Sequence, residues 1–215
     1  MKIIDLTHLF SSDTPVYPGT RPPNLKKGND LEKDGFRETI LSFYSHTGTH
    51  IDAPAHMLSD GPYLENIPIN NFIGKAIILD FSNFCKPLIT LPDIINFQEK
   101  LTKVNFVILK TGWSNFWMDN RYFYNYPSLN KEAACWLSKF NLNGIGIDAI
   151  SIDKSDSTTF DTHKLFFAKN MLIIENLTNL DSINVEYFTL AVFPLKFKNS
   201  DGSPVRAIAI IDNIK

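Results

Sequence analysis

Three of the five histidines lie close together in the segment SHTGTHIDAPAH at 45–56. On a strand, His46, Gly48, His50 and Asp52 point to one face, and Gly48 leaves space between the two rings. Imidazole nitrogen and carboxylate oxygen bind divalent ions such as zinc, and three such ligands leave positions open, as catalytic sites do. The segment therefore predicts a catalytic metal site.

The third histidine of this segment, His56, follows the turn that Pro54 predicts. An imidazole beside a metal-bound water is a candidate general acid and base. Histidines four residues apart also occur on helices and loops without binding an ion, but the added Asp52 and the third histidine favour the metal site. His8 stands alone near the N-terminus, and we expect it to pack or to form a hydrogen bond.

A second pair lies far along the chain, with His163 in FDTHKLFF and Glu175 at the end of MLIIE. Taken alone, His163 is interpreted as an exposed residue at the start of a helix, and Glu175 as a capping or ion-paired acid. A buried carboxylate, however, must be paired or metal-bound. As complements to the first cluster, the two residues would complete the shell of a second ion, with Asp52 as the bridge.

The elements that must position these side chains are mostly strands. Apolar, β-branched runs of strand length recur at Ile3–Leu6, Thr39–Phe43, Ala76–Phe81, Phe106–Leu109, Ile145–Ile147, Leu172–Ile174, Phe188–Phe193 and Ala207–Ile211. Helical signals cover Asp93–Thr102, Lys131–Phe140 and Thr162–Lys169, and long loops are expected at Thr14–Asp30, Asp52–Gly74 and Ser114–Leu129. Many strands with few helices favour an α/β or α+β fold, in which residues 1–215 form one domain with a mixed β-sheet and flanking helices.

Composition and charge narrow the class of partner. The net charge of −2 and the pI near 6.2 give no broad basic surface, so we expect a small-molecule substrate, with no nucleic acid and no membrane as partner. The apolar region of a signal peptide is missing from MKIIDLTHLF, which favours a cytoplasmic location. Cys85 and Cys135 lie in apolar surroundings and are expected to be free, buried thiols.

The segment HTGTHIDAPAH resembles the HxGTHxDxPxH signature of the cyclase family that includes bacterial kynurenine formamidase. The resemblance extends over nearly the whole chain, through IDLTHLF, TPVYPGT, TGW and GIDAISID to His163 and Glu175. It implies a compact mixed-sheet fold with flanking helices that assembles into a homodimer or homotetramer. The loop Leu58–Ile73 is the expected subunit contact, through Tyr63, Leu64 and Phe72.

The resemblance also assigns roles to the site residues. Two zinc ions per chain would be held by His46, His50 and Asp52 at the first position and by Asp52, His163 and Glu175 at the second, with Glu175 able to contact both. His56 would be the proton donor and acceptor. Manganese is the alternative metal, because histidine and carboxylate ligands suit zinc, manganese and iron alike.

The one departure from the family pattern is Tyr17 in PVYPG, which occupies the position of a tryptophan that contacts the substrate's aromatic ring in kynurenine formamidases. Tyrosine stacks with less area. The first expectation is hydrolysis of N-formylkynurenine to kynurenine and formate by metal-bound hydroxide, and the alternative is another small amide or a lactam such as isatin. A rival class is a non-catalytic metal-binding protein of the same fold, but a free His56 beside an open metal position argues against it.

Overall fold

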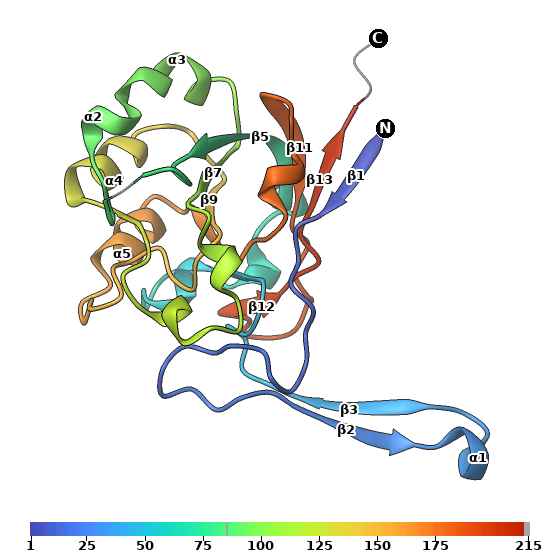
Figure 1. Ribbon diagram of the computed structural model, residues 1–215. Helices are drawn as coiled ribbons and strands as arrows, with labels where there is room; N and C mark the ends of the chain where they lie inside the picture. Colours follow the sequence, from blue (N-terminus) through green and yellow to red (C-terminus); the bar gives the residue numbers. More distant parts are fainter. Residues whose placement is uncertain (85, 213–215) are drawn as a thin grey trace.

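The computed structural model describes residues 1–84 and 86–212, and Cys85 lies outside this description. A nine-stranded mixed sheet forms the body of the protein (Figure 1). In sheet order the strands are β1 (Lys2–Asp5), β13 (Ile208–Ile211), β11 (Tyr187–Ala191), β5 (Ile73–Asp80), β7 (Phe106–Lys110), β9 (Gly144–Ile147), β10 (Leu172–Glu175), β4 (His50–Asp52) and β12 (Gly202–Pro204). The neighbours β5, β7, β9 and β10 are parallel, and the other pairs are antiparallel.

The central strands are buried on both faces. Along β7, Val107 and Leu109 belong to one apolar core, whereas Phe106 and Ile108 belong to another on the opposite face. The first core is covered by α2 (Leu91–Ile94), α3 (Gln98–Leu101), α4 (Lys131–Leu137) and α5 (Asp161–Phe167), which lie together on one side of the sheet in Figure 1. Burial on both faces explains why these strands have continuous apolar sequences.

The predicted helices are found with one correction. Lys131–Phe140 and Thr162–Lys169 correspond to α4 and α5, but Asp93–Thr102 is not one helix, since α2 and α3 are separated by the 3-10 turn Ile95–Phe97. A capping box begins α2 early, because the Thr90 backbone N–H donates to the Asp93 carboxylate at 2.8 Å. No helix of the described residues is long and apolar enough to cross a membrane.

A hairpin formed by β2 (Asn24–Asn29) and β3 (Glu38–Ser42) projects away from the body (Figure 1). Its tip is α1 (Leu31–Asp34), which begins with the Asp30 carboxylate accepting from the Glu32 N–H and ends at Gly35 with φ of 80°. The prediction of a loop over Thr14–Asp30 is therefore wrong for its second half. Every residue of β3 is exposed.

Other short elements complete the described chain. A second two-stranded sheet pairs β6 (Leu88–Ile89) with β8 (Ser128–Leu129). Further 3-10 turns are η1 (Pro54–His56), η2 (Leu64–Asn66), η3 (Ile69–Phe72), η5 (Trp113–Phe116), η6 (Asn120–Phe123) and η7 (Leu180–Ser182).

The loop Leu58–Ile73 buries two of the three side chains that were expected to form its contact surface. Leu64 and Phe72 are 2% and 3% exposed and pack in the second core, so only Tyr63 of the three expected contact residues is exposed. The expected exposure of Leu64 and Phe72 is wrong because both side chains return to the sheet, whereas Ile69 of the same loop is 67% exposed. The subunit contact through this loop stays a prediction. Cys135 is free, as expected, but only half-buried.

Candidate metal centre

The segment before β4 is a turn. Only His50–Asp52 form a strand, and Gly48 has a φ of 66°, so the expected alternation over residues 46–52 is wrong. A Cβ on Gly48 would lie 3.3 Å from the Phe10 ring, which shows that this glycine permits the turn rather than leaving space between the ligands. The turn still folds His46 back toward the strand.

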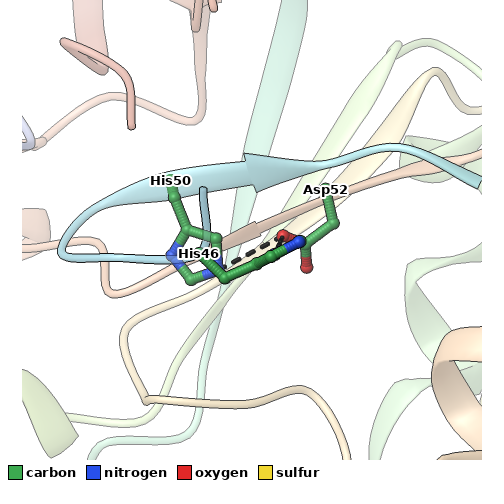
Figure 2. A group of neighbouring side chains, drawn as sticks. All are labelled: His46, His50 and Asp52. Carbon is green, nitrogen blue, oxygen red and sulfur yellow. Dashed lines mark hydrogen bonds and ion pairs between the residues drawn. The ribbon is translucent and has the colours of Figure 1, made fainter. Parts of the chain in front are cut away.

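The three side chains of this segment converge (Figure 2). Asp52 Oδ1 lies 2.6 Å from His46 Nδ1 and 3.2 Å from His50 Nε2. The other nitrogen of His50, Nδ1, donates to the Gly48 carbonyl at 2.8 Å, so Nε2 is the nitrogen left for a ligand role. Because His50 and Asp52 are almost completely buried, the group could hold a metal ion away from bulk water.

The distant pair joins this group through sheet pairing. Strand β10 runs antiparallel to β4 with Glu175 opposite His50, and α5 brings His163 alongside. His163 Nε2 lies 3.3 Å from Glu175 Oε1 and 3.7 Å from Asp52 Oδ2, while His50 Nε2 lies 3.6 Å from Glu175 Oε2. Each carboxylate therefore turns one oxygen toward each histidine, as a bridge between two ions requires. His163 is buried rather than exposed at the start of a helix.

Residues outside the predicted set contact these candidate ligands. The Asp153 carboxylate lies 2.5 Å from His163 Nδ1 and also accepts from the backbone N–H groups of Thr162 and His163. The Asn176 amide donates to the Gly48 carbonyl at 2.8 Å and accepts from the Tyr122 hydroxyl at 2.7 Å. Metal-binding histidines are commonly held by such partners. Their only sequence signals are that Asp153 ends GIDAISID and that Asn176 follows Glu175.

His56 lies at the edge of the cluster. It ends η1, and its ring centroid is 3.8 Å from that of His46 and 6.3 Å from that of His163. Its Nδ1 is 3.6 Å from Asp201 Oδ2, and the same oxygen is 3.0 Å from His46 Nε2. Sequence reasoning missed Asp201, which reaches the site because β12 pairs with β4, placing Gly202 opposite Asp52.

The carboxylates of the site carry negative charge that a bound cation would balance. Burial favours the neutral ring of His46, but Asp52 and Asp201 outweigh burial and raise its pKa to about 10. Burial likewise opposes ionisation of Asp52, yet the rings of His50 and His46 hold its pKa well below the usual range. The carboxylates thus draw positive charge into a buried space. The buried imidazole and carboxylate donors fit one or two divalent ions.

A cavity of about 680 Å³ opens beside the cluster. His46, His50, Asp52, His56, His163 and Glu175 line it together with Tyr17, Phe160 and Asp201. The rings of Tyr17 and Phe160 are 6.4 Å apart, and Phe160 has a φ of 52°, a backbone conformation uncommon for an aromatic residue. The volume suits a small-molecule ligand, and the two rings provide aromatic surface for it.

His8 is not a member of the metal-capable groups found among the described residues. Its ring stacks on Trp117 with centroids 3.8 Å apart, and its Nε2 is buried without a hydrogen-bond partner among the described residues. Burial lowers its pKa to about 4.

Comparison with known proteins identifies the family. Residues 4–154 match the family model described as "Putative cyclase". The chain belongs to this family. A kynurenine formamidase from Bacillus mycoides (strain KBAB4) is 32% identical to this cyclase-family chain over 206 residues, 95% of each protein.

Solved structures of similar proteins have the same fold. Isatin hydrolase A from Ralstonia solanacearum superposes with a TM-score of 0.88 at 25% identity, covering 98% of this chain and 92% of that one. A protein described as a "potential metal-dependent hydrolase with cyclase activity" superposes with a TM-score of 0.80 at 28% identity, covering 97% and 96%. The predicted mixed α/β fold with flanking helices and the resemblance to the cyclase family are both confirmed.

Proposed function

We propose that this cyclase-family protein is an arylformamidase, which hydrolyses N-formylkynurenine to kynurenine and formate. The chain is a metal-dependent amide hydrolase, acting on carbon–nitrogen bonds. The observation that carries the proposal is the pair of ligand groups sharing Asp52, placed beside His56 on the wall of one cavity. Curated kynurenine formamidases that match 95% of the chain support the choice of substrate.

The five predicted ligands would hold two ions. One would be bound by His46, His50 and Asp52, and the other by Asp52, His163 and Glu175, with Glu175 within reach of both. We propose zinc, with manganese as the alternative, because imidazole and carboxylate donors suit both. When bound, such ions polarise a carbonyl oxygen and lower the pKa of a coordinated water towards ~7.

His56 would move the proton. It is half-exposed at the cavity and close to both ligand groups, which suits a group that must meet substrate and water. Its ring would accept a proton from the attacking water and return it to the arylamine nitrogen. The carbon–nitrogen bond then breaks, and formate leaves with the oxygen of the water.

Tyr17 and Phe160 would receive the substrate ring. Both line the cavity, and both side chains can pack on an aromatic ring. The smaller ring of Tyr17, at the tryptophan position of kynurenine formamidases, together with the structural likeness to isatin hydrolase A, favours a second candidate reaction. This is opening of a lactam such as isatin, in which the same water attack breaks an amide bond within a ring.

We also propose that residues 1–215 act as one domain and form a cytoplasmic homodimer or homotetramer. The hairpin supports an oligomer, because a two-stranded hairpin alone is at best marginally stable in water. Its strand β3 presents Ile40 and Leu41, both more than half exposed. Burial against a second copy of the chain would remove this apolar surface from water.

The test follows hydrolysis of N-formylkynurenine and of isatin by absorbance, after the apoprotein is reloaded with zinc or manganese. We expect metal-dependent turnover of N-formylkynurenine that His56→Ala greatly reduces. Faster turnover of isatin would move the assignment to the lactam. No turnover of either amide, at near-stoichiometric metal, would favour the non-catalytic metal-binding protein.

A further inference from the structure

We propose that Asp201 is a positioning residue, whose single carboxylate oxygen holds both the ligand His46 and the acid/base His56. Oδ2 of Asp201 lies 3.0 Å from His46 Nε2 and 3.6 Å from His56 Nδ1. The two rings lie against each other, tilted by 31° with centroids 3.8 Å apart, so the same oxygen faces a nitrogen of each ring. The proposal rests on the proposed function for the role of His56.

Asp201 and Asp52 contact opposite nitrogens of the His46 ring. Nδ1 faces Asp52 at 2.6 Å, whereas Nε2 faces Asp201. A histidine that ligates a metal with one nitrogen commonly donates its other N–H to a carboxylate, which fixes the ring and raises its basicity. Asp201 is therefore placed as the outer partner of a metal ligand, and Asp52 as the carboxylate on the metal side.

The backbone around Asp201 is held in place from several directions. The Asp201 carbonyl accepts from the Ala53 N–H at 2.9 Å. The Glu65 carboxylate accepts from the N–H of Asn199 at 2.6 Å and from the Ser200 hydroxyl at 2.8 Å. These bonds tie the segment before β12 to the residue after β4 and to η2, so the carboxylate of Asp201 is presented at a defined position.

The next residue shows that this position is built around the His46 ring. A Cβ on Gly202 would lie 2.4 Å from His46 Cε1, so only glycine allows the ring to lie against this backbone. The ring is thus bounded by Gly202 on one side, by the His56 ring on another and by a carboxylate at each nitrogen. Gly202 restrains only one side of the His46 ring, so loss of Asp201 would let the Nε2 edge of that ring move.

The same carboxylate faces one nitrogen of His56, Nδ1, at 3.6 Å. An ionised carboxylate attracts a nitrogen that carries a proton, so this contact favours the ring with its proton on Nδ1. Nε2 is then the nitrogen left to accept and return the substrate's proton. Without Asp201, the ring would sample both tautomers and several orientations, which slows the proton step and leaves substrate binding unchanged.

The first experiment measures metal affinity without turnover. Apoprotein of the wild type, Asp201→Ala and Asp201→Asn is titrated with zinc alone. We expect a ~10–100-fold weaker affinity in Asp201→Ala and a smaller loss in Asp201→Asn, which keeps an acceptor oxygen. The control is Asp60→Ala, which removes an exposed carboxylate from a nearby loop. Unchanged affinity, or a loss of one whole ion per chain, would overturn the proposal, since the latter makes Asp201 a ligand.

The second experiment is a double-mutant cycle with His56 at saturating metal. We expect Asp201→Ala to lower kcat ~10–100-fold with little change in KM, and to have no further effect in a His56→Ala background. If the kcat losses of the two single variants multiply in the double variant, Asp201 does not act by positioning His56. If the wild type hydrolyses neither amide, the proposed function fails, whereas weaker zinc binding by Asp201→Ala still supports the hold on His46. If Asp201→Ala does not fold, Asp201→Asn serves in both experiments.

Discussion

The buried cluster around Asp52 and the exposed β2–β3 hairpin reverse the usual distribution of polar and apolar side chains in opposite ways. Asp52 and Glu175 are 1% and 4% exposed although they carry charge, whereas Ile40 and Leu41 of β3 are 58% and 55% exposed although they are apolar. Charged residues are almost never fully buried unless they are paired. The burial of charge in the cluster and the exposure of apolar side chains in the hairpin are therefore both unfavourable for the folding of the chain by itself.

The two regions differ in how much of the arrangement the chain itself completes. In the cluster, every carboxylate faces imidazoles, and outer partners such as Asp153 hold the rings. In the hairpin, the strands contact mainly each other. The side chains of the cluster are thus already arranged to bind a small ion. The exposed surface of the hairpin, by contrast, is large enough that only another macromolecule could cover it.

The largest effect is expected from Asp52→Asn, which removes the charge shared by both ligand groups. The amide keeps the shape of the carboxylate but cannot balance two cations. We expect metal content below about a tenth of the wild-type value and a loss of turnover larger than the ~10–100-fold that removal of an outer partner costs. Metal analysis and the shift in Tm on adding zinc measure it. Near-normal metal content would show that Asp52 is not a ligand.

A smaller loss is expected from His56→Ala, because this residue is proposed to move a proton and not to bind metal. Turnover should fall by ~10²–10⁴-fold, the usual contribution of a general acid and base. Metal content should stay at the wild-type level. Full activity in this variant, or metal loss equal to that of Asp52→Asn, would contradict the assigned role.

Asp153→Asn tests the outer support of the cluster. Asp153 touches His163 and the first turn of α5, so the variant should weaken zinc binding by ~10–100-fold and leave some turnover at high zinc. Titration of the apoprotein gives the affinity. As a control, Asp156→Asn changes an exposed acid three residues further along the chain that forms no ion pair among the described residues. Equal affinities in the two variants would show that Asp153 does not orient His163.

The convergence of His46, His50 and Asp52 was predictable because the three residues lie within a few positions of one another. The central strands were predictable because burial on both faces makes their sequences apolar throughout, as in β7. The contacts of Asp201 were not, since they depend on β12 pairing with β4. The sequence of β12, Gly-Ser-Pro, lacks strand composition, and Pro204 is tolerated because β12 is an edge strand. Likewise β2, with the sequence NLKKGN, has no apolar alternation.

His8 contrasts with the cluster, because its partly buried ring has no charged partner among the described residues. Its folded pKa of about 4 lies below the ordinary 6.5, so the unfolded chain binds the extra proton more readily. This contribution to stability is complete above pH 6.5 and is lost as the pH falls toward 4. His8→Phe keeps an aromatic ring on Trp117 but has no imidazole to titrate. As the pH falls over this range, the Tm of the variant should therefore fall less than that of the wild type, by a few degrees at ~2–4 °C per kcal/mol. Parallel Tm curves for the two proteins would refute it.

The smallest effect on chemistry, and the sharpest test of the hairpin, is Ile40→Lys. If β3 packs against a second copy, a buried charge there should disrupt the assembly and lower the molar mass measured by light scattering after size exclusion. Zinc content should not change, and stability of the chain itself should change by no more than ~0.5 kcal/mol, since the side chain is exposed. Thr39→Lys is the matched control, because Thr39 is exposed and precedes Ile40 on β3, so its side chain points to the other face of the hairpin. An unchanged molar mass in Ile40→Lys would show that Ile40 is not part of a contact between copies.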